Sequence, residues 1–246
     1  MPPIPEPDSG KAEMETAEFD SFADEYYAML ANSISGSGER PEYFAEYKIN
    51  DIYREYSRRQ TDENHALKIL DFGAGVGSSI PYVRKFWEKS QLTCIDPSQR
   101  SLNIAKQRFP RSADFIQSDG ISIPSSSEYF DIVYATCVFH HIYQKAHKAL
   151  VQEIYRVLRP AGYIFIFEYN PYNPVTTRIV NQCPFDKNAK LIHSKQMEDT
   201  LLSAGFDNAA SKYKIFFPHV LRVLRPLERA MTWLPLGAQY YTMAKK

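Results

Sequence analysis

The chain has 246 residues, a hydrophobic share of 44%, and 29 basic against 29 acidic residues. This length fits one α/β domain with additions, or at most two small domains. Nucleic-acid-binding proteins usually carry a basic excess, so the zero net charge argues against a DNA or RNA partner. The three cysteines form neither a metal-binding motif nor an even set for disulfides, and we expect no bound metal.

The N-terminal segment is polar and rich in proline, which predicts a disordered tail over residues 1–15. It lacks the basic and then apolar pattern of a signal peptide. No apolar run approaches the roughly 20 residues that a membrane-spanning helix needs. We therefore expect a cytoplasmic protein without stable membrane insertion.

Two amphipathic segments follow the tail. Apolar residues recur at helical spacing from Phe19 to Leu30 and again from Phe44 to Tyr56. Gly36 and Gly38 interrupt the pattern between them. The spacing predicts a helical N-terminal cap over residues 16–60, ahead of a core over residues 61–246.

From residue 67 onward, short apolar runs alternate with helical patterns, as in successive βαβ units. The expected fold is a doubly wound α/β domain with a mostly parallel sheet, whose first strands are at 67–73, 91–96, 113–119, 130–138 and 162–169. An irregular insert near 170–193 comes next, followed by a helix over 195–206 and a strand over 211–217. A second insert, near 218–238, precedes the last strand.

The most informative segment is the glycine-rich turn after the first expected strand, Asp71-Phe72-Gly73-Ala74-Gly75-Val76-Gly77. Such a turn lets a ligand approach the backbone closely. A dinucleotide fingerprint would place its third glycine at position 78, where this chain has Ser78. The acid at Asp71 suits a cationic ligand without phosphate, and S-adenosylmethionine is such a ligand. A tight turn without a ligand is the alternative.

Two more acids end expected strands. Asp96, followed by Pro97, comes about 20 residues after the glycine turn, where an acid can bind ribose hydroxyls. Asp119, followed by Gly120, is placed to accept a hydrogen bond from an adenine amino group. Both dipeptides also start ordinary turns, which is the alternative for each.

Together these segments resemble the ordered motifs of class I S-adenosylmethionine-dependent methyltransferases, namely DFGAGVG, CIDPS, QSDG, FDIVYATCVFHHI and VLRPAGYIFIFE. The resemblance spans about residues 19–245, and FDSFADEYY resembles the cap of small-molecule members. It implies a seven-stranded sheet with an antiparallel last strand, and S-adenosylmethionine at the carboxyl ends of the strands. It also implies a set of cofactor contacts, which are Tyr26, Asp71, Gly73, Ala74, Gly75, Asp96, Pro97, Asp119, Gly120 and Cys137.

The acceptor side is expected beyond the fourth and fifth strands. His140 and His141 follow the fourth strand, where a histidine could act as general base for a hydroxyl or amine acceptor. The predicted acceptor-binding residues are Glu168, Asn170, Asn173 and Arg178. The alternatives are a buried core histidine with a helix-capping partner, asparagines that only form turns, and a solvated arginine.

A looser resemblance of EYNPYNPVTTRIVNQCPFD and LPLGAQYYTMAKK to bacterial methyltransferases of uncertain substrate favours a sugar-like or secondary-metabolite acceptor. Two rival functions remain. A nicotinamide-dependent dehydrogenase conflicts with Asp71 and with Ser78. A non-catalytic S-adenosylmethionine-binding partner or regulatory protein would share every cofactor contact.

The insert HVLRVLRPLERAMTW has an apolar stripe through Val220, Leu224, Leu227 and Met231. Pro226 predicts two short helices in place of one. We expect this insert and the N-terminal helices to roof the acceptor pocket. Two alternatives are that the stripe binds an anionic membrane surface or that it forms a homodimer contact.

Overall fold

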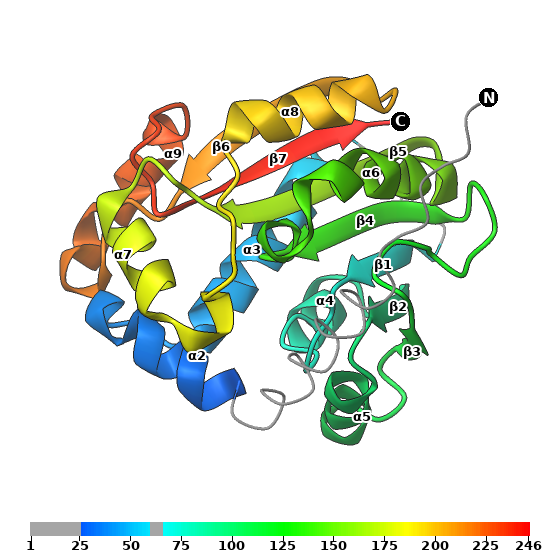
Figure 1. Cartoon of the computed structure of the whole chain (residues 1–246), viewed down its shortest axis with the longest axis horizontal. Helices are drawn as coiled ribbons and strands as arrows, with labels where there is room; N and C mark the ends of the chain where they lie inside the picture. Colours follow the sequence, from blue (N-terminus) through cyan, green and yellow to red (C-terminus); the bar gives the residue numbers. More distant parts are fainter. Residues whose placement is uncertain (1–25, 60–65) are drawn as a thin grey trace.

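The computed structural model describes residues 26–59 and 66–246 (Figure 1). The expected tail over residues 1–15 and the first part of the cap, residues 16–25, lie outside the described residues. None of the helices in the described ranges is long and apolar enough to cross a membrane.

Seven strands form one sheet in the order β3-β2-β1-β4-β5-β7-β6. The strands are β1 (Lys68–Phe72), β2 (Gln91–Asp96), β3 (Asp114–Gln117), β4 (Phe130–Thr136), β5 (Leu158–Tyr169), β6 (Asp207–Lys214) and β7 (Gln239–Lys245). The first five pair in parallel, and β7 runs antiparallel to both of its neighbours. The expected doubly wound sheet and its antiparallel last strand are confirmed.

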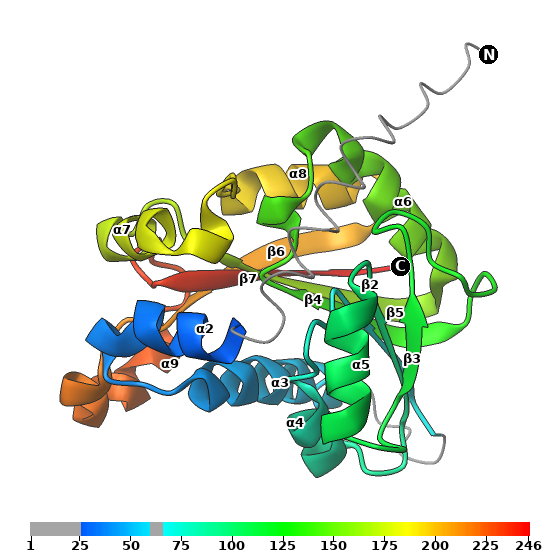
Figure 2. The same ribbon diagram turned by 60° about the horizontal axis from the view of Figure 1, so that its bottom comes forward.

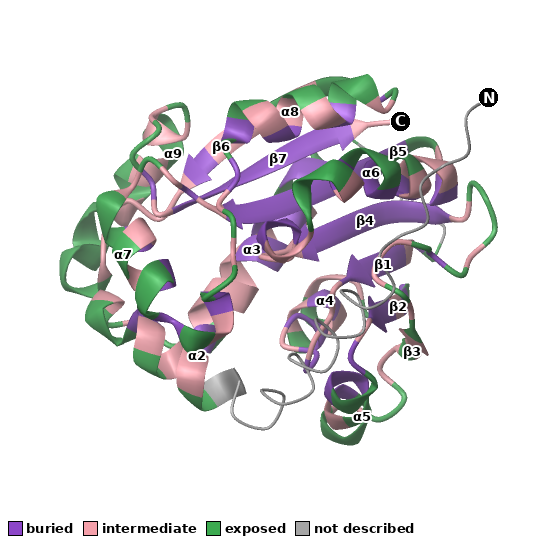
Figure 3. Cartoon of the chain, in the orientation of Figure 1, coloured by how far each residue is buried: buried purple, intermediate pink, exposed green. Residues whose placement is uncertain are grey.

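Helices cover both faces of the sheet (Figure 2). One face carries α6 (His147–Val157) and α8 (Ser194–Ser203), and the other carries α3 (Pro41–Ser57) and α4 (Ile80–Phe86). Alternate residues of β1 enter the two cores, because neighbouring side chains of a strand point to opposite faces: Ile69 packs with α3, and Leu70 with α6. Figure 3 shows the buried strands between the two layers. The remaining helix of the parallel half is α5 (Gln99–Arg108).

Two helices of the predicted cap are described. Pro41 occupies the first turn of α3, where its missing N–H leaves no bond unmade, and Ile49 and Ile52 are buried against the sheet. The shorter helix α2 (Tyr26–Ile34) is joined to α3 by the 3₁₀ turn η1 (Ser35–Ser37). The expected helix between Phe44 and Tyr56 is confirmed by α3.

The segment near 170–193 is not irregular throughout, which corrects our expectation. It contains the helix α7 (Pro174–Gln182) and the short turn η4 (Pro184–Asp186). Asn173 caps α7 by accepting a hydrogen bond from Thr176 N at 3.0 Å, and Pro174 stands at its first position. These residues favour turns in isolation, but the same types also start helices.

The second insert forms two short helical segments, but Pro226 lies inside the first of them instead of separating them. They are η5 (His219–Leu227), which is a 3₁₀ helix, and α9 (Glu228–Met231). The predicted apolar stripe does not form a roof, because Val220 is 82% exposed and Leu227 56% exposed. The reason is the local geometry: the helix is a 3₁₀ helix and is kinked at Leu221, so its side chains do not follow the spacing of one continuous α-helix.

The glycine turn after β1 generates a test of the fold. Gly73 has φ +75°, and a Cβ added there would lie 2.4 Å from Val138 Cγ2. Gly75 has φ +51°, but a Cβ there would meet nothing within 4 Å. Both Gly→Ala changes strain the backbone by about 1 kcal/mol, and only Gly73→Ala adds a clash of roughly 2 kcal/mol.

We therefore expect urea unfolding to show that Gly73→Ala lowers the free energy of unfolding by about 2 kcal/mol more than Gly75→Ala. Equal losses would contradict the close contact with Val138.

Candidate functional site

The site lies at the carboxyl ends of β1, β2, β4 and β5, which the parallel register brings together. Phe72 is opposite Ile95 on one side and Ala135 on the other. The turn after β1 is attached to β2, since Gly73 N and Ala74 N both donate to Ile95 O, at 2.9 and 3.0 Å. Open space in front of Gly75 leaves room for a ligand to approach this turn.

Asp71 lies beneath the turn and is 1% exposed. Its Oδ2 accepts a hydrogen bond from Ser79 Oγ, which in turn accepts one from Tyr134 Oη at 3.1 Å. Its Oδ1 is buried and has no hydrogen-bond partner among the described residues. Burial raises the pKa of Asp71 to about 6, although the bond from Ser79 opposes the shift. An unpartnered buried acceptor fits a ligand that brings an N–H donor or a positive charge.

The other two predicted cofactor acids bind backbone N–H groups. Asp96 Oδ2 accepts from Gly75 N at 2.8 Å, and its Oδ1 accepts from Ser98 N at 2.9 Å. Asp119 is exposed, and its carboxylate accepts from Ile121 N and from both the N–H and the hydroxyl of Ser122. Each acid therefore shapes its own turn, and Asp96 also orders the glycine turn toward which it points. Pro97 and Gly120 follow these acids in the same turns.

Cys137 begins the turn after β4 and adopts a positive φ of 59°. Its N–H donates to Phe167 O at 2.8 Å, which attaches the turn to β5. Lys48 of α3 is buried, and its Nζ lies 3.1 Å from Cys137 Sγ. Lys48 is not among the residues predicted from the sequence, where its only signal is a basic residue on the apolar face of a cap helix.

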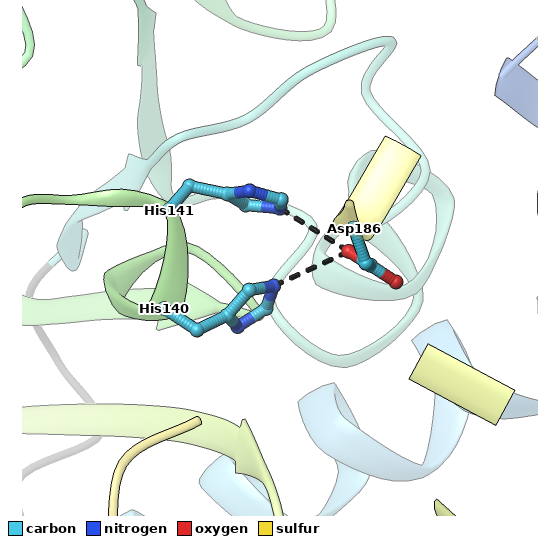
Figure 4. Close-up of side chains that lie close together, drawn as sticks. All are labelled: His140, His141 and Asp186. Atoms are coloured by element: carbon cyan, nitrogen blue, oxygen red, sulfur yellow. Dashed lines mark ion pairs between the residues drawn. The ribbon is translucent and has the colours of Figure 1, made fainter. Parts of the chain in front are cut away.

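Four ionisable side chains meet beyond β4 and β5: Glu168, His140, His141 and Asp186. Glu168 Oε2 lies 2.5 Å from His140 Nδ1, and both residues are fully buried. Asp186 Oδ1 lies 3.5 Å from His140 Nε2 and 3.4 Å from His141 Nε2 (Figure 4). Glu168 Oε1 accepts hydrogen bonds from Val138 N and Phe139 N, at 3.2 and 2.8 Å.

The two histidines differ in charge. Burial lowers the pKa of His140, but the negative charge of Glu168 and the contact with Asp186 outweigh it and raise the pKa to about 10. Burial lowers the pKa of His141, and the neighbouring positive charge of His140 adds to this effect. Although burial raises the pKa of Asp186, its two histidine neighbours lower it well below its usual range. At neutral pH His140 is an imidazolium and His141 is neutral.

Three residues of this cluster could also hold a metal ion. One ligand atom each from His140, His141 and Asp186 lies within 4.8 Å of the other two. Two imidazoles and a carboxylate are ligands for zinc or iron. The His140 imidazolium offsets one of the two carboxylate charges, and a cation could offset the other, so the expectation of no bound metal stays a prediction.

A small cavity of about 20 Å³ adjoins the cluster. Its lining comes from α2, the β4 and β5 ends and η4, and consists of Met29, Leu30, Cys137, His140, His141, Tyr169, Cys183, Phe185 and Asp186. Met29 and Leu30 are not among the site residues predicted from the sequence. The side chain of Tyr26, a predicted cofactor contact, lies outside what the structure describes.

Three predicted acceptor-binding residues lie away from this cavity's lining. The buried amide of Asn170 donates to Pro235 O and Gly237 O, and Asn173 donates to Leu236 O. Arg178 is exposed on α7, beside a shallow surface depression of about 550 Å³ that shares no residue with the cavity. Glu168 alone of the four predicted residues belongs to the buried cluster.

The sheet order, the glycine turn and the acids in β1 and at the end of β2 are those of the class I methyltransferase fold. Residues 70–166 match the model of a family described as a methyltransferase domain. A crystal structure of an S-adenosylmethionine-dependent methyltransferase from Archaeoglobus fulgidus shares the fold. Its TM-score is 0.66 at 17% identity, over 90% of this chain and 100% of that one.

Two curated relatives extend the comparison. Cycloartenol-C-24-methyltransferase 1 of Oryza sativa subsp. japonica is 24% identical over 80% of this chain and 62% of its own length. A ubiquinone/menaquinone biosynthesis C-methyltransferase of Campylobacter jejuni is 31% identical over 42% of this chain and 45% of its own length. The chain thus spans less than two thirds of either relative. Residues 70–166 match a methyltransferase domain, and the chain is similar in sequence and fold to S-adenosylmethionine-dependent methyltransferases.

The buried ion pair generates the second prediction. In Glu168→Gln the amide cannot balance the His140 imidazolium, so the pKa of His140 should fall from about 10 toward neutrality. The free energy of unfolding at pH 7 should fall by about 3 kcal/mol, since one charge of a buried pair loses its partner.

NMR titration of the histidine side chains and urea unfolding measure the two effects. Glu153→Gln, which breaks an ion pair with Arg156 at the surface of α6, is the control and should cost under about 1 kcal/mol. An unchanged His140 pKa would contradict the assigned charge state.

Proposed function

We propose that the protein transfers the methyl group of S-adenosylmethionine to an oxygen of a small-molecule acceptor held beside His141. The observation that carries this proposal is the buried Glu168–His140–Asp186–His141 cluster at the end of the sheet where the glycine turn lies. S-adenosylmethionine supplies a methyl carbon already activated by its sulfonium. The protein has to align the acceptor, exclude water and accept a proton.

We propose His141 as the proton acceptor. Its neutral ring has a nitrogen that can take the proton of an acceptor hydroxyl as that oxygen bonds to the methyl carbon. The carbon–sulfur bond breaks in the same step, and S-adenosylhomocysteine leaves. His140 already carries its proton, so its role is to hold Asp186 between the rings. An amine acceptor would use the same base.

The proposed cofactor contacts follow the glycine turn. Gly75 leaves open space for the ligand, and Gly73 and Ala74 form the turn beside it. Asp71 Oδ1, which has no hydrogen-bond partner among the described residues, suits the cationic end of the ligand. Asp96 would bind the ribose hydroxyls, and Asp119 the adenine amino group. Pro97, Gly120, Cys137 and Tyr26 would complete this set.

The cavity lining supports an acceptor with an apolar body and one hydroxyl. Met29, Leu30, Tyr169 and Phe185 offer apolar surface, whereas the polar groups gather at the histidines. Cycloartenol and the quinones that appear in the relatives' names are likewise apolar molecules. This lining favours a secondary metabolite or lipid-like alcohol over a bare sugar. Asn170 and Asn173 instead hold the insert through backbone carbonyls, and Arg178 lies on α7 outside the cavity lining. Glu168 alone of the predicted acceptor residues is therefore proposed for the site.

A non-catalytic S-adenosylmethionine-binding protein is the second candidate, because it would share the glycine turn and the acids. Incubation with methyl-labelled S-adenosylmethionine and a cell extract separates the two. Transfer of label to a small molecule supports the enzyme, and binding of S-adenosylmethionine without transfer supports the binding protein.

The third prediction concerns the cofactor. Asp96→Ala removes the acceptor for two ribose hydroxyls, at a cost on the order of 2 kcal/mol. Calorimetry should therefore show a loss of affinity for S-adenosylmethionine of roughly thirtyfold. Asp114→Ala, which removes an exposed acid of β3, should bind like the unchanged protein. Unchanged affinity in Asp96→Ala would reject the ribose assignment.

The fourth prediction concerns the base. His141→Gln should lower kcat about a hundredfold with little change in cofactor affinity. The pH profile of kcat/KM should hold steady through neutrality and fall only below the ordinary histidine pKa of 6.5, because the pKa of His141 is lowered. It should fall again as pH approaches 10, where His140 loses its proton.

His193→Gln, at an exposed histidine, should leave the rate unchanged. The assay is run with and without EDTA, since the cluster also has a metal donor set. A rate abolished by EDTA would replace the base with a metal-bound acceptor. Full activity of His141→Gln would show that alignment alone suffices.

A further inference from the structure

The exposed apolar residues of the molecule gather on one insert. Among the described residues, eleven large hydrophobic side chains are exposed, and seven of them lie between 220 and 236. The most exposed are Val220 at 82%, Val223 at 79% and Trp233 at 73%. Exposed apolar residues scattered singly need no explanation, but a contiguous group marks an interaction surface.

The contacts of η5 show which of its side chains face the protein. The helix is kinked at Leu221, where φ and ψ are non-helical, so its residues do not form continuous rows. Glu39 Oε1 lies 3.0 Å from His219 Nδ1 and 2.5 Å from Arg225 Nη2, which holds both basic side chains against the protein. Val220 and Val223 are instead exposed to solvent.

The insert is firmly attached to the rest of the fold. The Arg225 guanidinium lies 4.6 Å from the centre of the Tyr43 ring, which joins η5 to the start of α3. Glu228 Oε1 accepts hydrogen bonds from Phe216 N and Phe217 N, both at 3.0 Å. Asn170 and Asn173 hold the far end of the insert through Pro235, Leu236 and Gly237. The exposed valines thus belong to an ordered surface.

The same surface continues onto α7 and is basic. Asn173 bonds to Leu236 O, so the exposed Tyr172 and Val175 at the start of α7 lie next to the end of the insert. Figures 1 and 2 both place α7 and α9 at the same end of the molecule. Residues 218–236 contain three arginines and a single acid, whereas the whole chain has no net charge. Arg222 and Arg229 are exposed among the apolar side chains.

We propose that Val220, Val223, Leu227, Trp233 and Leu236, which we call the insert surface, dock on an anionic lipid bilayer. Apolar side chains of an interfacial helix enter the boundary between headgroups and acyl chains, while arginines contact anionic headgroups. Tryptophan is enriched at this boundary, and the ring of Trp233 is exposed while its N–H donates to Ala230 O at 3.0 Å. The charge of the insert selects a bilayer over a second copy of this chain, since two such basic surfaces repel each other.

This orientation brings the proposed site close to the bilayer. Asn170, which holds the insert, directly follows Tyr169, which lines the cavity beside His140. An amphiphilic alcohol could then reach the histidines without leaving the lipid for water. Docking itself does not depend on methyl transfer, so vesicle binding and catalysis fail separately.

The experiment uses the full chain and vesicles of phosphatidylcholine, with and without phosphatidylglycerol. The chain has two tryptophans, so Trp87→Phe leaves Trp233 as the reporter. We expect sedimentation with the anionic vesicles and a blue shift of Trp233 fluorescence. Paired changes of Val220 and Val223 to Ser should weaken binding about tenfold. Changing Arg222 and Arg229 to Gln should weaken binding to anionic vesicles about fivefold each.

Leu202→Ser, at an exposed leucine of α8 on the other face of the sheet, is the control and should bind normally. Thermal unfolding should be unchanged in the valine and arginine variants, because these side chains are already exposed. The proposal is overturned if anionic vesicles leave Trp233 unshifted, or if the valine pair binds as well as the unchanged protein. A dimer in ultracentrifugation that the valine changes dissolve, without vesicle binding, would assign the surface to a second copy.

Discussion

The buried carboxylate of Glu168 is the interaction on which the acceptor end of the site depends. It comes from the end of β5, yet it binds the N–H groups of Val138 and Phe139, which belong to the turn after β4. A buried charge that loses such partners costs several kcal/mol, so this turn has little freedom to move. This loop also fixes the positions of both histidines, because His140 contacts the same carboxylate and His141 is the next residue in the chain. Glu168 thus sets both the position of the two histidines and the positive charge of His140.

A second buried polar side chain, that of Asn170 at the end of β5, fixes the position of the insert. Asn170 is fully buried, and it uses its side-chain amide on the backbone of residues 235 and 237. The end of the insert is therefore fixed to the strand that carries Glu168. A surface that docks on lipid must be held rigidly if it is to present a site at a defined depth. Asn170 provides this rigid link, because it bonds to the insert and is adjacent in sequence to Tyr169, which lines the cavity.

The parts of this structure that depend on local sequence could be predicted, and those that depend on distant pairs could not. The glycine turn and Asp96 follow from spacing, because a strand-to-helix turn needs particular residues at fixed positions. The contact of Asp186 with the two histidines joins residues about 45 apart, and no pattern in one sequence encodes it. The helix α7 was missed because its Asn-Pro start resembles a turn. The apolar stripe of the insert was wrongly expected to pack as a roof, because a 3₁₀ helix kinked at Leu221 does not follow α-helical spacing, although the basic charge of the insert was visible in the sequence.

The cavity volume constrains how an acceptor enters. About 20 Å³ accommodates roughly one water molecule, whereas pockets for small molecules measure some hundreds of Å³. Side chains around the acceptor position must therefore move when the acceptor binds. The β4 and β5 ends are fixed by Glu168, but Met29 and Leu30 belong to a nine-residue helix, which has little stability apart from its packing. Displacement of α2 is thus the least costly way to open the cavity, and it exposes apolar surface that an apolar acceptor would cover again.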